Sequence, residues 1–209
     1  MRTVRSGILF AALLVGGFVA RAAESPPAMD RDARARQAMA ERLAHAASPA
    51  YNPYETETVD RRDAALKLID QKKYAEAIAA LQQGLKQSPF NIDLLILLAA
   101  AYRDIGELGK ADETRTRWIA LVDSILTEGN GRTFDSAFRV IDVHEEYAVI
   151  QILRLNVVGQ RLQRRGDSEF DVMTVQGRDP GAQSFELYFN VDLPKRWLAR
   201  QLGGKDKSK

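Results

Sequence analysis

The feature that most constrains the fold is a change in apolar spacing near residue 129. Between residues 74 and 85 the apolar side chains recur three and four residues apart, which places them on one face of a helix. Between residues 184 and 193 they alternate with polar ones, which is typical of a strand with one buried face. The chain therefore predicts an α+β fold, with a helical module over residues 51–128 and a β-rich module over 129–202.

Four helices are expected in the first module. The first begins at Thr56 or Thr58, and Lys72 and Lys73 mark the turn to the second, which starts at Tyr74 and ends before Pro89. Asn91 can cap the third helix, whose residues 92–102 are apolar all round and suit a sandwiched position. The fourth follows Gly109, and we expect its apolar face, with Trp118, to pack against the sheet.

The second module predicts a mainly antiparallel sheet that shares one core with the helices. Candidate strands cover residues 138–143, 147–155, 170–176 and 184–193, and residues 195–202 form a terminal helix. The basic run at Arg161, Arg164 and Arg165 is expected in a solvated loop. Residues 203–209 are predicted to be a disordered tail.

The N-terminus predicts export. Arg2 and Arg5 precede an uncharged, largely apolar run over residues 6–20, and Ala20-Arg21-Ala22 has the small-x-small pattern of a cleavage site. We therefore expect a signal peptide over residues 1–22 and a periplasmic or secreted location; the alternative is an uncleaved anchor, for which the run is short. The chain has no Cys, which excludes a lipoprotein anchor and disulfides.

Charge gives no support for nucleic-acid binding. The chain has 30 basic and 28 acidic residues, and removal of Arg2, Arg5 and Arg21 leaves 27 basic residues, a net charge of −1. Residues 23–50 are rich in Ala, Arg and Pro, and are expected to form a flexible or weakly helical leader. Asp30 could cap a short helix that ends at Leu43. Tyr51-Asn-Pro-Tyr54 is expected to fasten the chain to the folded part.

Two resemblances rest on these residues. Tyr74, Ala77, Leu81, Gly84 and Pro89, with counterparts in the next unit, resemble two tetratricopeptide repeats. The phrases GNGRTFDSAF, EEY and LYFNVD, within residues 51–193, are similar to the domain-of-unknown-function 4919 family of exported bacterial proteins. That resemblance implies compartment and fold, but no activity.

Two groups of polar residues are candidate sites. Asn130, Thr133, Asp135 and Ser136 follow the glycine turn and could hold a small polar ligand, while Tyr188 and Asn190 on the exposed face of the last strand could contact a partner. If residues 142–146 are extended, then Asp142, His144 and Glu146 project to one face and could bind a divalent metal. The alternative, which we favour, is a solvated hairpin turn, where charged residues are common and need no partner.

No catalytic motif is present in the sequence. It has no Gly-x-Ser-x-Gly elbow, Walker loop or dinucleotide fingerprint, so no cofactor is predicted. We expect a non-enzymatic exported accessory protein that binds another envelope or secreted protein, or an envelope component, with no stable membrane anchor after signal cleavage. The alternative is an exported hydrolase or a small-molecule or metal-binding protein with its site near residues 129–146.

Overall fold

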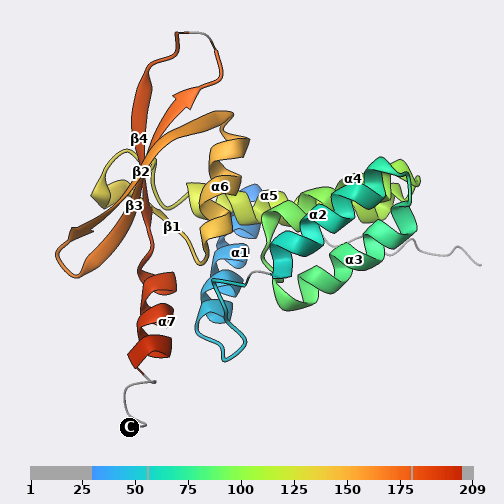
Figure 1. Cartoon of the computed structure of the whole chain (residues 1–209), viewed down its shortest axis with the longest axis horizontal. Helices are drawn as coiled ribbons and strands as arrows, with labels where there is room; N and C mark the ends of the chain where they lie inside the picture. The colour runs from blue at the N-terminus through green and yellow to red at the C-terminus, as the bar shows by residue number, and fades with distance from the viewer. Residues whose placement is uncertain (1–29, 56, 180, 204–209) are drawn as a thin grey trace, which may run out of the picture.

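The computed structural model describes residues 30–55, 57–179 and 181–203, and these form seven α-helices and a four-stranded mixed sheet (Figure 1). This confirms the predicted α+β class. Figure 1 shows the sheet and the last helix on one side, and an arm of helices reaching away from them. The predicted signal peptide and residues 204–209 of the predicted tail lie outside the described residues.

The arm consists of two helical hairpins. These are α2 (Glu57–Asp70) with α3 (Tyr74–Gln87), and α4 (Ile92–Asp104) with α5 (Leu108–Leu126). The predicted stripe of α3 is buried, and the Asn91 side chain caps α4 by accepting from the Leu94 amide at 2.9 Å. All four helices predicted in this module are therefore confirmed.

The segment predicted as a flexible or weakly helical leader forms a helix, α1 (Arg31–Ala46), that is packed along α5. Asp30 caps it, as predicted, and accepts from the Ala33 amide at 2.6 Å. Ala35, Ala38 and Ala46 are buried, and Arg42 is buried with them. The prediction was wrong because small alanines allow close helix approach, and because a paired arginine can replace an apolar anchor.

The sheet has the order β1-β4-β3-β2, and its bounds are β1 (Phe138–Arg139), β2 (Leu155–Arg165), β3 (Ser168–Gly177) and β4 (Ser184–Asn190). The short β1 runs parallel to β4, whereas the other two pairings are antiparallel. A mainly antiparallel sheet is thus confirmed, and β3 and β4 match their predicted segments. The last helix, α7 (Asp192–Gly203), begins earlier than expected.

One strand prediction and one loop prediction were wrong. Most of residues 147–155 belongs to a helix, α6 (Val143–Ile152), because Asp142 caps its first turn and accepts from the Glu145 amide at 2.9 Å. The basic run expected in a loop belongs to β2, which is an edge strand. Most of its side chains are exposed on both faces, so they give no alternating apolar pattern.

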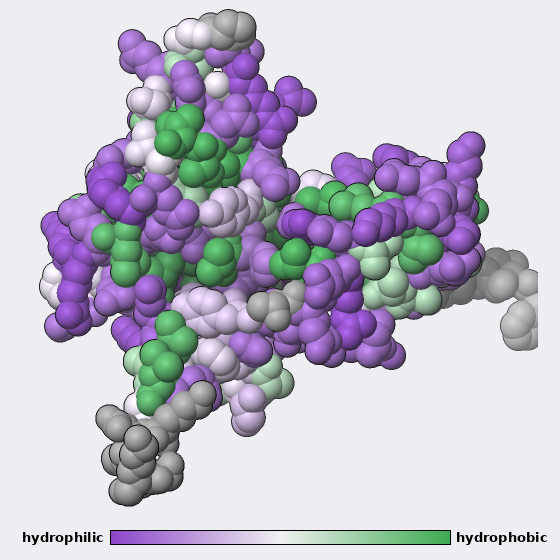
Figure 2. Space-filling view, viewed as in Figure 1, coloured by the Kyte–Doolittle hydropathy of each residue, from purple (hydrophilic) through white to green (hydrophobic). Residues whose placement is uncertain are grey.

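One core joins the helices to the sheet. It contains Ile92, Ile125, Val149, Met173 and Phe189, which come from α4, α5, α6, β3 and β4, and Trp118 packs partly buried against it. Figure 2 shows that the outer surface in the same view is mainly polar, with apolar side chains in separate patches. Within the described residues, no helix is both long enough and apolar enough to cross a membrane.

Candidate functional site

The predicted site in the glycine loop is a structural turn whose polar groups bond to one another. Thr133 and Ser136 form a capping box around a short 3₁₀ helix at residues 134–136, and the Asn130 side chain accepts from Ser136 Oγ at 2.8 Å. The Asp135 side chain is 83% exposed and pairs with Arg165 at 2.9 Å. These four residues therefore stabilise the loop, and none of them is buried beside a cavity.

Tyr188 and Asn190 are also engaged within the chain. The Tyr188 hydroxyl donates to Glu186 at 2.7 Å, and its ring lies edge-on to Phe134 with centroids 4.7 Å apart. The Asn190 side chain accepts from the Asp192 amide at 3.1 Å. The structure brings Tyr188 against the glycine loop, but it leaves Asn190 at the start of α7.

The predicted metal site is contradicted by the geometry of α6. The three side chains would converge on a strand, but residues two apart on a helix point about 200° apart. Asp142 caps the helix, half-buried His144 lies near Asp93 and Arg62, and Glu146 faces Asp171. Among the described residues there is no group of three or more acidic or histidine side chains that could hold a metal ion.

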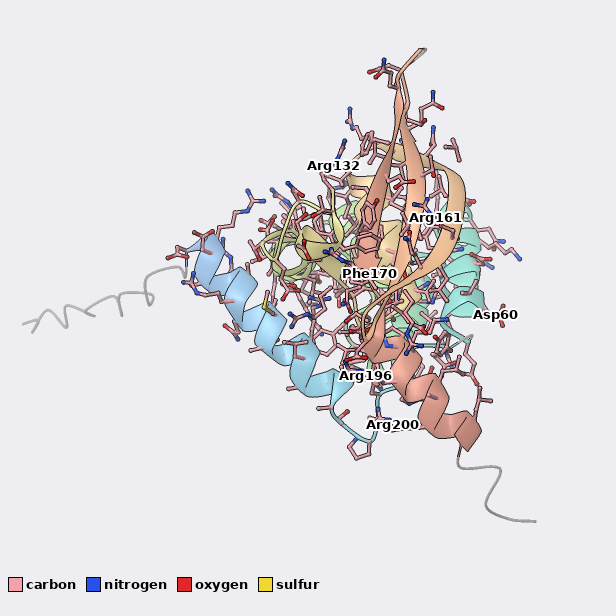
Figure 3. All side chains as sticks on the ribbon, turned by 90° about the vertical axis from the view of Figure 1, so that its left-hand side faces the viewer. Asp60, Arg132, Arg161, Phe170, Arg196 and Arg200 are labelled. Atoms are coloured by element: carbon pink, nitrogen blue, oxygen red, sulfur yellow. The ribbon has the colours of Figure 1, made fainter. Side chains whose placement is uncertain are left out.

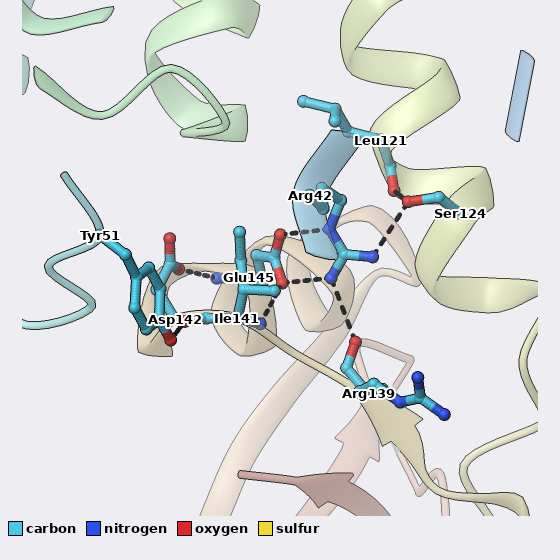
Figure 4. Close-up of polar contacts among 8 residues, drawn as sticks. All are labelled: Arg42, Tyr51, Leu121, Ser124, Arg139, Ile141, Asp142 and Glu145. Atoms are coloured by element: carbon cyan, nitrogen blue, oxygen red, sulfur yellow. Dashed lines mark hydrogen bonds and ion pairs between the residues drawn. The ribbon is translucent and has the colours of Figure 1, made fainter. Parts of the chain in front are cut away.

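The same helix takes part in a fully paired buried network, shown in Figure 4. The Arg42 guanidinium donates to both oxygens of Glu145, at 2.7 and 2.5 Å, and also to Ser124 Oγ and the Arg139 carbonyl, both at 3.1 Å. Arg42 and Glu145 are each only 1% exposed. The amide of Ile141 donates to Glu145 at 2.8 Å, so the acid is satisfied from two sides.

This network fixes the start of α6. Because Arg42 comes from α1 and Ser124 from α5, the network ties α6 to both helices. Tyr51 adds a further tie by donating its hydroxyl to the Ile141 carbonyl, which confirms that the Tyr51 segment fastens the chain to the folded part. The position of the next residue on α6, Glu146, is therefore held rigidly.

Glu146 is the exceptional group in this part of the molecule. It is 0% exposed, and neither of its carboxylate oxygens has a hydrogen-bond donor. A buried carboxylate without a partner is costly, so the neutral form is favoured. Burial raises the pKa of Glu146 to about 9, with a further contribution from the nearby carboxylates of Asp171, Asp142 and Glu145. Glu146 is therefore protonated at neutral pH, and in that form it can donate to Asp171.

Glu146 and Asp171 line a pocket of about 390 Å³ between the sheet, α6 and α7. Tyr54, Arg161 and Lys195 are also among its lining residues. Asp171 is half-buried and is held from the outer side by Gln160, whose amide donates to it at 2.6 Å. Glu146 is closed to solvent, so the carboxylate available to a ligand in this pocket is that of Asp171.

Figure 3 looks onto this side of the molecule, with Arg161 on the sheet and Arg196 and Arg200 on α7. Arg161 is occupied by an ion pair with Glu186 at 2.6 Å. Lys195, in contrast, makes no ion pair with any other described residue. The pocket thus combines an acid pair with one unpaired cation among its lining residues.

Sequence reasoning identified Glu146 but not its role or its partner. The sequence Asp-Val-His-Glu before an apolar run is an N-terminal helix signal, and it would have separated Glu146 from His144. No sequence signal singles out Asp171, because an acidic residue in an alternating strand is ordinarily solvated. The two acids come together only because α6 packs against the sheet that contains β3.

Comparison with known proteins gives one match. No curated protein and no solved structure matches the chain. A family described as a domain of unknown function (DUF4919) matches residues 43–199, which is well over half of the sequence and includes both acids of the pocket. This chain belongs to the DUF4919 family.

Proposed function

We propose that the protein is an exported, non-enzymatic accessory protein that binds an envelope component or an envelope protein through the Glu146–Asp171 pocket. The apolar N-terminal run with its cleavage pattern supports export to the periplasm or beyond. The ligand class that fits the pocket carries a protonated amine with an anionic group close to it.

The observation that carries this proposal is the buried Glu146 carboxyl group without a donor, next to a half-buried acid in a pocket. Buried polar groups are nearly always satisfied, so a buried acid without a donor, next to a second acid that a ligand can reach, marks this pocket as the candidate binding site. An ammonium group would pair with the Asp171 carboxylate, which lies beside the neutral Glu146. The unpaired Lys195 on the pocket wall would bind the ligand's anionic group.

The structure favours binding over hydrolysis. A general acid must reach the proton acceptor of its substrate, whereas Glu146 is fully covered. The alternative site near residues 129–146 would require Asp135, His144 and Glu146 in one cavity, but Asp135 is on the surface and His144 faces Asp93. Glu146 therefore does not contact the ligand. As the protonated member of the acid pair, it leaves the negative charge on Asp171.

Three probes of similar size test this proposal by ligand-observed NMR on residues 23–209. 4-Aminobutyrate carries both charges, butylamine only the ammonium and butyrate only the carboxylate. We expect 4-aminobutyrate to bind best, butylamine more weakly and butyrate not at all.

Asp171→Asn should abolish binding of both amines, whereas Asp135→Asn, which removes an exposed acid elsewhere, should leave it unchanged. Lys195→Gln should reduce 4-aminobutyrate binding to the level of butylamine. Failure of both amines to bind, or equal binding by the Asp171→Asn variant, would contradict the proposal.

A further inference from the structure

A second cavity lies apart from the acid pair, in a groove between α4 and α5. Its volume is about 530 Å³, and its apolar lining includes Ile96, Ala99, Leu108 and Trp118. Leu108 is 61% exposed, which is unusual for a large apolar side chain on a helix of a packed array. An apolar groove of this size, open to solvent, indicates a surface for another protein.

The first hairpin shows what such a groove holds. A spacing of 34 residues relates Ala99 and Ala111 in the groove to Ala65 and Ala77 in the first hairpin. Those two alanines are fully buried, and Ala65 forms a core with Leu94 and Leu98 of α4. The equivalent position in the first hairpin is therefore occupied by a packed helix, whereas in the second hairpin it is open.

At three equivalent positions the second hairpin has different residues from the first, and these differences suit its open groove to a different helix. At the same spacing, Ile78 corresponds to Asp112, Leu81 to Arg115 and Gly84 to Trp118. Gly84 is in close contact with Leu94, since a Cβ there would lie 2.8 Å from its side chain. The second groove thus keeps the small alanines but adds an acid, a base and a large ring, and so it suits an occupant of matching charge.

The order of these residues along α5 is self-complementary. Leu108, Asp112, Arg115 and Trp118 give the pattern apolar, acidic, basic, apolar. If two α5 helices pair antiparallel about a twofold axis between residues 113 and 114, each Asp112 lies opposite the other copy's Arg115. Each Leu108 then lies within one residue of the position opposite the other copy's Trp118. Within one chain, the exposed Asp112 and Arg115 form a long ion pair of 3.9 Å, which pairing across the axis would replace.

We propose that this face binds a second copy of the chain, so that two α4–α5 hairpins form a twofold four-helix interface. Twofold dimers with one self-complementary patch are the commonest homo-oligomers. This interface lies on the helical arm, so the proposal is independent of the ligand pocket.

Analytical ultracentrifugation of residues 23–209 over a range of concentrations tests this proposal. We expect a monomer–dimer equilibrium, with the dimer dominant at high concentration. Arg115→Asp would place four acids at the twofold axis and should raise the dimer dissociation constant at least tenfold. The double variant Asp112→Arg with Arg115→Asp exchanges the charges and should restore dimerisation to within a few-fold of the original.

Lys86→Asp on α3 is the matched control, because it reverses an exposed charge outside the groove, and it should leave the equilibrium unchanged. Circular dichroism melting checks that each variant is folded, which we expect because the substituted side chains are exposed. A chain that stays monomeric at every concentration would overturn the proposal. So would a double variant that remains as weak as Arg115→Asp alone.

Discussion

Glu145 and Glu146 are neighbours on α6 and are both buried, yet their environments are opposite. Glu145 receives donors from Arg42 and from the Ile141 amide, whereas Glu146 has no donor and faces another acid. The first arrangement stabilises the fold only as a complete set, since loss of one partner leaves a buried charge. The second opposes stability at neutral pH and lies beside a pocket. The contrast shows that burial of an acid does not reveal its role; its partners do.

The most severe test removes the partner of Glu145. We expect Arg42→Met to lower the free energy of unfolding by about 3 to 5 kcal/mol, because the Glu145 carboxylate then stays buried without its cation. Urea unfolding followed by circular dichroism measures this change. Adding Glu145→Gln to Arg42→Met should recover part of the loss, because the amide oxygen can still accept from Ile141. Losses that add up in the double variant would show that the two side chains act independently.

The opposite sign is expected for Glu146→Gln. Burial raises the pKa of Glu146 from an ordinary 4.5 to about 9, so folding costs more as pH rises between these values. At pH 8 the variant should be more stable than the original chain by roughly 3 to 5 kcal/mol, and the gain should vanish below about pH 4.5. Urea unfolding at several pH values measures this difference.

Glu76→Gln, at an exposed position on α3, is the control and should change stability little at any pH. A Glu146→Gln gain that does not depend on pH would show that packing, and not protonation, sets the effect.

The sequence predicts those elements of the fold that bury one regular apolar face, but not the contacts between distant polar residues. Periodicity predicted the four helices of the arm together with β3 and β4, because one face of each is buried. It did not predict β2, an edge strand with little burial, or the packing of α1, which is through alanines and a paired Arg42. The acid pair could not be predicted, since Glu146 and Asp171 meet only through the packing of α6 near β3.

A smaller effect is expected at the start of α6, which carries both glutamates. Asp142→Ala should destabilise the protein by about 1 kcal/mol, because the amide of Glu145 loses its capping oxygen. Asp142→Asn should cost much less, since asparagine also caps helices well. Thermal unfolding compares the two. Equal losses would show that the charge of Asp142, and not its capping bond, matters.

The smallest effect is expected in the glycine loop, which the sequence offered only as a candidate ligand site. Asp135→Ala removes an exposed ion pair with Arg165 and should change the unfolding free energy by less than about 0.5 kcal/mol. It should also leave amine binding unchanged. A marked loss of amine binding by this variant in the NMR assay would return the candidate site to this loop.

The most direct test of the central claim is a carbon-13 NMR titration of the Glu146 side-chain carboxyl group. The claim is that Glu146 is a neutral acid behind Asp171, kept so by burial and by the acids around it. We predict that this carbon titrates with a pKa of about 9. Titration near the ordinary value of 4.5 would mean that solvent or an internal donor already satisfies Glu146, and it would contradict the assignment of this pocket as a ligand site.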